Sequence, residues 1–326
     1  MTSLTQAPGT TPDTTPVTPP RTDQAVRGNR LARFTPYGLI GPALVAFAAV
    51  LGYPIVRLIW LSLQDFGPRS LFTGEAPFVG LDNFTRVLGD SDFWFTLLRT
   101  LIVSVACVSS LMVIGFLLAS LLMQVSAWAR VMLSVCLVLV WAMPMVSATM
   151  IWRWLFEPQY GVLNWVITQL KVFGDFSAHD WFSSPSQALF LIIALIVWKG
   201  LPFVALTLYA AMGQIPGDLY EAAALDGAGR WNVARHVTMP ILAPVLAVLV
   251  LLEVIWSVNS FTPIWVLTQG GPDGGTTTLG VYSYLEAFTR NDYSGGAAIA
   301  IITVLLLAVL SVLYVRRLFA QDEVIA

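Results

Sequence analysis

The sequence carries little charge. Only 11% of its 326 residues are charged, whereas 57% are hydrophobic, and the mean hydropathy is +0.75. Soluble domains carry about twice that share of charged residues. The formal net charge is -2, and no cluster of Lys and Arg resembles a nucleic-acid surface. The composition therefore argues against a soluble fold and against a nucleic-acid partner.

Catalytic motifs are missing as well. A loop that holds the phosphates of ATP needs a glycine directly before its lysine, and neither Lys171 nor Lys199 follows one. His179 and His236 lie far apart, and no zinc-protease or serine-nucleophile motif occurs. Both cysteines lie inside apolar runs, where they read as small hydrophobic residues. We expect a non-catalytic protein without cofactor or metal site.

Long apolar runs are what the sequence has instead. A membrane-spanning helix needs about 20 mostly apolar residues. Pro144 is expected to kink one of the qualifying segments. Residues 1–34 are rich in Thr and Pro and are expected to form a disordered tail. The prediction is an all-α, polytopic membrane bundle over residues 35–326 with six transmembrane helices, at 38–63, 97–123, 131–154, 187–212, 241–266 and 296–315.

The distribution of basic residues predicts the orientation. An even number of spans places both termini on one side, and Lys and Arg favour the cytoplasmic side. The connections on the opposite side hold only Arg69, Arg86, Lys171 and Arg290. Both termini are therefore expected in the cytoplasm. The basic residues on the side of the termini are Arg21, Arg27, Arg30, Arg33, Arg130, Arg230, Arg235, Arg316 and Arg317.

The cytoplasmic connection between the fourth and fifth predicted spans, residues 213–240, is the most informative segment. Residues 216–225 predict a short helix, because Pro and Asp in the first turn favour a helix N-terminus. Gly227 permits a sharp turn, and Pro240 is expected to close a second helix before the next span. The segment is therefore predicted to be a helix-turn-helix on the inner membrane face.

This loop resembles the EAA loop of the permease subunits of binding-protein-dependent ABC importers. The family pattern is E-A-A, three residues, G, nine residues, I, one residue, L-P, and the chain matches it with small changes at the last apolar positions. Ala234 departs from it, since the carbohydrate branch usually has Phe there. The resemblance assigns contact with the ATPase to Glu221, Ala222, Ala223, Asp226, Gly227 and Pro240.

Further matches resemble the carbohydrate-uptake branch, the maltose-type permeases. They include Tyr53-Pro54, residues 78–84 (FVGLDNF) and residues 267–272 (LTQGGP). The resemblance implies a second, similar permease subunit, two cytoplasmic ATP-binding-cassette ATPase subunits and an extracytoplasmic solute-binding protein. It also implies import of a sugar or another polyhydroxylated solute, with glycerol phosphodiesters or polyols as the alternative cargo.

Ionisable groups inside predicted spans are costly and therefore mark candidate solute contacts. Lys199 and Glu253 lie at similar depth, about 18–20 Å from the cytoplasmic ends of their helices. A structural ion pair between them is an equally open interpretation. The resemblance implies that the helices flanking the loop line the solute site. The candidate pathway residues at helical spacing are Lys199, Gly200 and Phe203 on the fourth span, and Glu253, Trp256, Ser257, Asn259 and Ser260 on the fifth.

Two other classes of protein remain to be weighed. A secondary transporter also places charged residues at mid-membrane depth, but it does not need an EAA-type loop. A non-transporting membrane scaffold does not need a buried polar face. The loop and the polar face together favour the ATP-driven permease.

Overall fold

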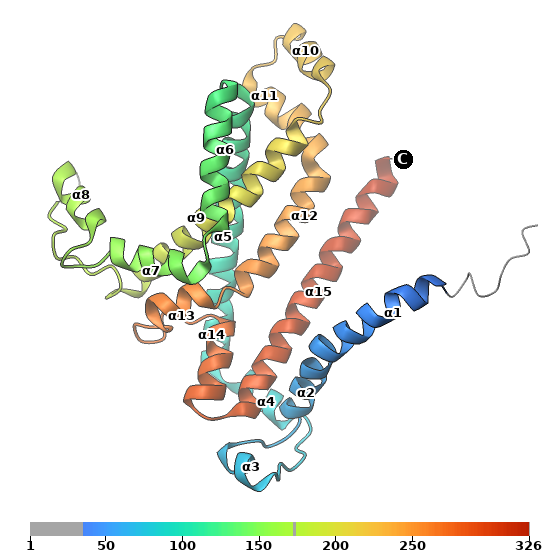
Figure 1. Cartoon of the computed structure of the whole chain (residues 1–326), viewed down its shortest axis with the longest axis vertical. Coiled ribbons are helices and arrows are strands. Elements are labelled where there is room, and N and C mark those ends of the chain that lie inside the picture. Colours follow the sequence, from blue (N-terminus) through green and yellow to red (C-terminus); the bar gives the residue numbers. More distant parts are fainter. Residues whose placement is uncertain (1–34, 172–173, 326) are drawn as a thin grey trace, which may run out of the picture. The chain divides into compact units, whose positions relative to one another are not determined.

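The computed structural model describes residues 35–171 and 174–325, and these are mainly helical (Figure 1). The predicted tail, residues 1–34, lies outside the described residues. The chain divides into two compact units with their boundary between Pro54 and Ile55. Each unit is described by itself.

The first unit begins with α1 (Thr35–Phe47) and continues through one π-helical turn, η2 (Ala48–Gly52). Its apolar side chains are exposed, Val45 to 70% and Phe47 to 65%. A helix that is apolar and exposed in isolation needs lipid or another protein around it. The next helix, α2 (Tyr53–Ser62), begins at the unit boundary, and the run Ile40–Ser62 is long and apolar enough to cross a membrane.

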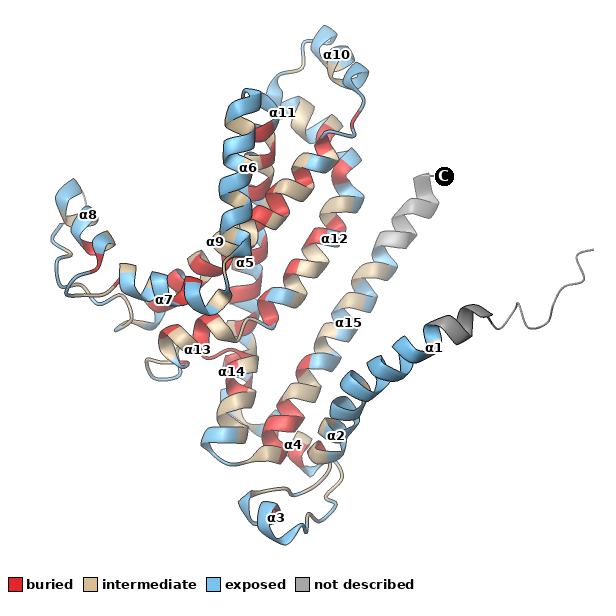
Figure 2. Cartoon of the chain, viewed as in Figure 1, coloured by how far each residue is buried: buried red, intermediate tan, exposed pale blue. Residues whose placement is uncertain are grey.

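The core of the second unit is built from three long helices, α5 (Ser91–Gln124), α9 (Pro185–Met212) and α12 (Met239–Val258). Figure 2 shows buried residues concentrated along α9. The backbones of α5 and α9 approach closely at Gly115, where an added Cβ would lie 2.6 Å from Cγ1 of Val204. Small residues that allow such approach are typical of helix packing in membranes.

The predicted third span is broken. It consists of α6 (Ala127–Ala142) and α7 (Met145–Leu155), which are bent by 101° at the break. Pro144 has no N–H to donate and disfavours helix at the residue before it, so the helix ends and a new one starts. The expected kink is therefore a complete change of direction.

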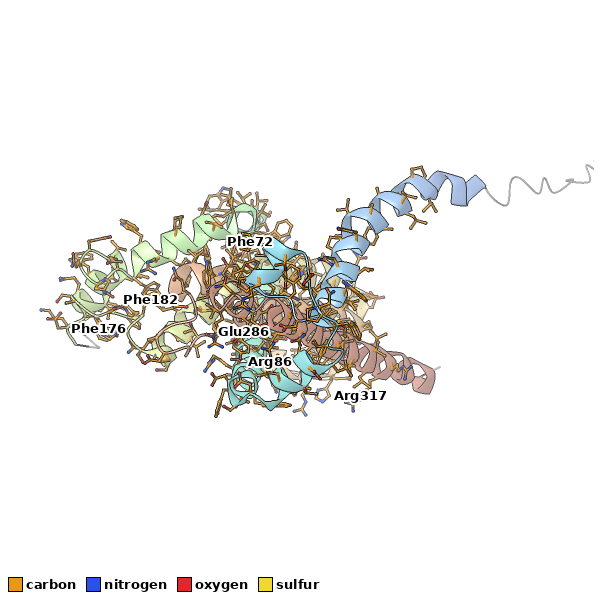
Figure 3. The ribbon with its side chains drawn as sticks, turned by 90° about the horizontal axis from the view of Figure 1, so that it is seen from below. Phe72, Arg86, Phe176, Phe182, Glu286 and Arg317 are labelled. Carbon is orange, nitrogen blue, oxygen red and sulfur yellow. The ribbon has the colours of Figure 1, made fainter. Side chains whose placement is uncertain are left out.

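At the end of the second unit opposite α10, short helices connect the long ones. They form a hydrogen-bonded cluster: Asn83 Nδ2 donates to the carbonyls of Ser62 and Gln64, and Arg86 pairs with Asp292 at 2.8 Å. Figure 3 looks onto this end, with Phe72, Arg86 and Glu286 near its centre. The helices here are α3 (Pro68–Thr73), α4 (Asp82–Gly89), α14 (Leu279–Tyr284) and η4 (Leu285–Thr289).

Tyr282 of α14 ties this cluster to the start of α5. Its hydroxyl donates to Asp90 at 2.8 Å. Burial, with this hydrogen bond, raises the pKa of the Tyr282 phenol. The remaining elements are α8 (Val162–Leu170), α13 (Thr262–Thr268) and α15 (Tyr293–Ile325). Helix α8 belongs to the lobe at the left of Figure 3, where Phe176 and Phe182 are labelled.

Five helical segments among the described residues are long and apolar enough to span a membrane. The bent pair α6 and α7 makes a sixth if it is counted as one span. The all-α membrane bundle is therefore confirmed. The five uninterrupted segments are Ile40–Ser62, Ser91–Gln124, Pro185–Met212, Arg230–Thr268 and Tyr293–Arg317.

Candidate functional site

The loop after α9 folds as two helices around a glycine. Helix α10 (Gly217–Leu225) follows Pro216, which stands at its N-cap, and Asp218 lies in its first turn. Gly227 then takes φ +74°, a left-handed conformation that L side chains adopt at a cost, and the N–H of Ala228 bonds back to the carbonyl of Ala223. The predicted helix-turn-helix is thus present.

Pro240 does not close the second helix, contrary to the sequence prediction. The chain runs from α11 (Arg230–Val233) through the π-helical turn η3 (Ala234–Thr238) directly into α12. Pro240 stands in the first turn of α12, where a missing N–H costs little, and the N–H of Met239 before it bonds five residues back, to the carbonyl of Ala234. The loop is therefore joined to the core by unbroken helix.

The predicted coupling residues lie mostly on the outside of this loop. Glu221, Ala222, Asp226 and Gly227 are exposed and Ala223 is half-buried. Pro240 is exposed but belongs to α12 rather than to the tip. At the tip, Leu225 is 90% exposed, a residue that sequence reasoning did not select. An apolar side chain so exposed at the end of a loop is suited to contact with another protein.

All eight candidate pathway residues line one cavity of about 530 Å³, a volume typical of small-molecule sites. It lies between α9, α12 and the break between α6 and α7. The structure therefore brings together residues from 199–203 and from 253–260. It adds residues that were not predicted: Trp141, Met143, Met145, Ile196, Phe261, Thr262 and Pro263. The residues from 141–145 line the cavity because the span is broken there. The one feature of the sequence that indicates this break is Pro144.

Lys199 binds the end of the broken span. Its ammonium donates to the carbonyls of Val140 at 3.0 Å and Trp141 at 2.6 Å. Both carbonyls belong to the last turn of α6, where the helix dipole favours a cation, and that of Val140 also accepts from the N–H of Met143. Of the ion pairs found among the described residues, none joins Lys199 to Glu253. The alternative of a structural pair is not realised here.

Glu253 is the buried acidic group of the cavity. It is only 3% exposed, and Oε1 has no hydrogen-bond partner among the residues that the structure describes. Gly200 of α9 packs beside it: a Cβ built there would lie 3.2 Å from Cδ2 of Leu111 and 3.7 Å from Oε2 of Glu253. A buried acceptor without a donor is costly and calls for one.

The aromatic and small polar residues are arranged around this carboxylate. Phe203 and Trp256 meet edge to face, with ring centroids 5.1 Å apart, and Trp256 remains 46% exposed. Ser257 Oγ lies 2.6 Å from Ser104 Oγ, which joins α12 to α5. Asn259 Nδ2 donates to the carbonyl of Ile255. The cavity thus combines exposed aromatic surface with a carboxyl group that lines its wall but is itself buried.

Comparison with known families and proteins agrees with these features. The family model described as "Binding-protein-dependent transport system inner membrane component" matches residues 111–322. The chain is 40% identical to the diacetylchitobiose uptake system permease of Streptomyces coelicolor, over 92% of this chain and 91% of that one. It is 34% identical to the trehalose/maltose transport system permease of Thermococcus litoralis, over 86% and 92% of the two chains.

Among solved structures, a chain of a bacterial ABC transporter involved in import of the acidic polysaccharide alginate has the same fold. The TM-score is 0.74, and the match covers 88% of this chain and 96% of that one. The sequence identity is 21%, so this likeness speaks for the architecture alone.

Proposed function

This chain belongs to the family of binding-protein-dependent transport system inner membrane components, and we propose that it imports a sugar or a related polyhydroxylated solute. It is a multi-pass inner-membrane permease component. The proposed cargo rests on the relatives for diacetylchitobiose and for trehalose and maltose, together with a cavity that joins aromatic surface to a buried acceptor. Sugars present hydroxyl donors and an apolar ring face to such a site.

We infer that the energy for import comes from other chains. The proposed assembly contains a second permease subunit, two cytoplasmic ATP-binding-cassette ATPase subunits and an extracytoplasmic solute-binding protein. The exposed α10, with Glu221, Asp226 and Leu225 on its accessible surface, is the proposed contact with an ATPase. Its carboxylates accept hydrogen bonds from the partner, and Leu225 buries an apolar side chain there.

We propose that both termini and the α10 loop lie in the cytoplasm. The asymmetry of basic residues supports this orientation, since the connections on the loop side hold Arg130, Arg230 and Arg235. The end of the second unit that carries α3, α4 and α14 then faces outward and receives the binding protein.

The proposed coupling is mechanical. A displacement of the loop by the ATPases moves α11, η3 and α12 as one helix, because no break separates them. Glu253 lies 23 residues from Arg230, or about 35 Å along a helix. Movement at the ATPase contact therefore reaches the residue that faces the solute, which permits alternating access from the two sides.

The observation that carries the proposal is the continuity between an exposed loop of the family type and a cavity with a buried, unpartnered carboxylate. The test is ATP hydrolysis by the assembled transporter in liposomes with its binding protein, across a panel of mono- and disaccharides, polyols and a glycerol phosphodiester. Stimulation by one sugar class supports the proposal. Transport by this chain alone, without ATPase subunits, would refute it.

A further inference from the structure

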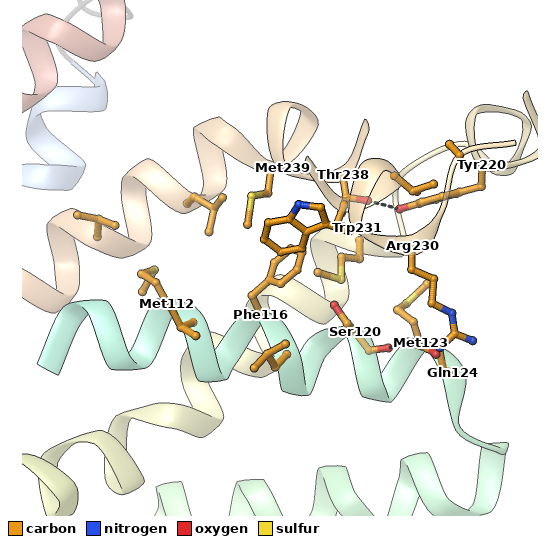
Figure 4. A pocket seen from close by; sticks show the side chains of 18 residues that line it. Met112, Phe116, Ser120, Met123, Gln124, Tyr220, Arg230, Trp231, Thr238 and Met239 are labelled. Carbon is orange, nitrogen blue, oxygen red and sulfur yellow. Dashed lines mark hydrogen bonds between the residues drawn. The ribbon is translucent and has the colours of Figure 1, made fainter. Parts of the chain in front are cut away.

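A second, larger cavity lies away from the proposed solute site. It encloses about 1050 Å³ between the loop-side halves of α5 and α12 and the helices α10 and α11 (Figure 4). Most of its wall is apolar, including Met112, Phe116, Met239 and Leu246. None of its lining residues is acidic, and Arg230 is its one basic residue.

The cavity is polar at one end only. In Figure 4, Arg230 and Gln124 lie together at one end of the groove, while Met112 lies at the other, and Trp231 and Phe116 lie between them. Trp231 is 71% exposed. Among the described residues, the guanidinium of Arg230 makes neither a hydrogen bond nor an ion pair, so it is free to bind an anion.

The length of the groove matches one leaflet of a bilayer. Met112 to Gln124 on α5 covers about 18 Å, and Met239 to Val250 on α12 about 16 Å, at 1.5 Å per residue. One leaflet of the hydrocarbon core is about 15 Å thick. An acyl chain entering beside Arg230 therefore extends along the apolar wall to the middle of the membrane.

We propose that this groove binds an anionic phospholipid from the leaflet on the loop side. Its phosphate pairs with Arg230, and one acyl chain lies between α5 and α12. The aromatic ring of Trp231 then sits at headgroup level, where Trp is enriched in membrane proteins. Tyr220 of α10 also lines the groove, and its hydroxyl lies 3.4 Å from Oγ1 of Thr238. The lipid would thus contact the loop that carries the proposed ATPase contact.

The binding test uses the full chain in nanodiscs of phosphatidylcholine doped with phosphatidylglycerol that bears a photoreactive diazirine in its acyl chain. Labelled peptides are expected from residues 112–124 and 239–250. Loss of the charge-assisted hydrogen bond to the phosphate should make Arg230→Gln lower labelling by about tenfold. Arg235→Gln is the matched control, because Arg235 is exposed on η3 but does not line the groove.

Three further arms make the outcome decisive. Labelled phosphatidylcholine should react more weakly and should be insensitive to Arg230→Gln. Inorganic phosphate at millimolar concentration should not compete, and displacement by it would show a free-anion site instead. Ala234→Phe, which fills the groove without a change of charge, should lower labelling by both lipids. Equal labelling by the two lipids, equal effects of the two arginine variants, or labels spread over other spans would overturn the proposal.

Discussion

Replacing Glu253 by Gln is expected to weaken solute recognition without loss of stability. The carboxylate is 3% exposed, and no donor in the described part of the chain reaches Oε1. If a solute hydroxyl donates to the carboxylate, Gln can still accept that hydrogen bond through its amide oxygen but loses the charge, a difference of about 1–2 kcal/mol. That range corresponds to an increase of about 5- to 30-fold in the half-saturating solute concentration. The folded protein loses no internal hydrogen bond at Oε1, so its stability should be equal or higher.

The assay is solute-stimulated ATP hydrolysis by the assembled transporter, with thermal unfolding of the same preparation. Glu157→Gln is the matched control, since Glu157 follows α7 outside the cavity and its side chain makes no hydrogen bond or ion pair among the described residues. Half-saturation in the control should remain within about twofold of wild type, the range expected for a substitution away from the site. If Glu253→Gln leaves half-saturation unchanged, or lowers the melting temperature, the acceptor role is wrong.

Substitutions at Lys199, Gly115 and Gly227 test the remaining features. Lys199→Met removes the donor from two carbonyls at the broken span and should lower the free energy of unfolding by about 1 kcal/mol. Lys199→Arg keeps a donor there and should retain most of that stability. Chemical denaturation of the purified chain distinguishes the two variants. Gly115→Ala should destabilise the fold by about 1–3 kcal/mol, because the added Cβ clashes with Val204. The double variant with Val204→Ala should recover part of this loss, and a double-mutant cycle measures the recovery. Gly227→Ala has open space for its Cβ, so it should strain only the left-handed backbone there, by about 1 kcal/mol. This strain should disturb the turn and weaken co-purification of the ATPase. Unaltered co-purification would contradict the importance of the turn.

Hydropathy and spacing predict the spans other than the broken third one, and they place the candidate residues of α12 on one helix face. The apolar runs predict the spans because the bilayer fixes their length. Periodicity places Glu253, Trp256 and Ser260 on one face of a helix, and the structure does place them on one cavity. The assignment of these residues to solute binding stays a prediction.

The break between α6 and α7 was beyond reach of the sequence alone. Pro144 indicates a disturbance, but a proline inside a span is compatible with a mild kink or a 101° bend. Whether the helix kinks or breaks depends on whether another group can donate hydrogen bonds to the carbonyls at the proline. Here Lys199, 55 residues or more further along the chain, supplies the donor, and a contact between distant segments leaves no local pattern.

Pro240 is the opposite case, because the helix continues through this proline. It stands just after the π turn over Ala234–Thr238, and the helix passes from the loop into the core. This continuity has a physical consequence for both cavities. The larger groove and the smaller cavity share α12, with Val250 lining the first and Glu253, less than one turn further on, lining the second. A rotation of α12 driven from α10 would therefore alter the two sites together, so occupancy of one should bias the other through the helix they share.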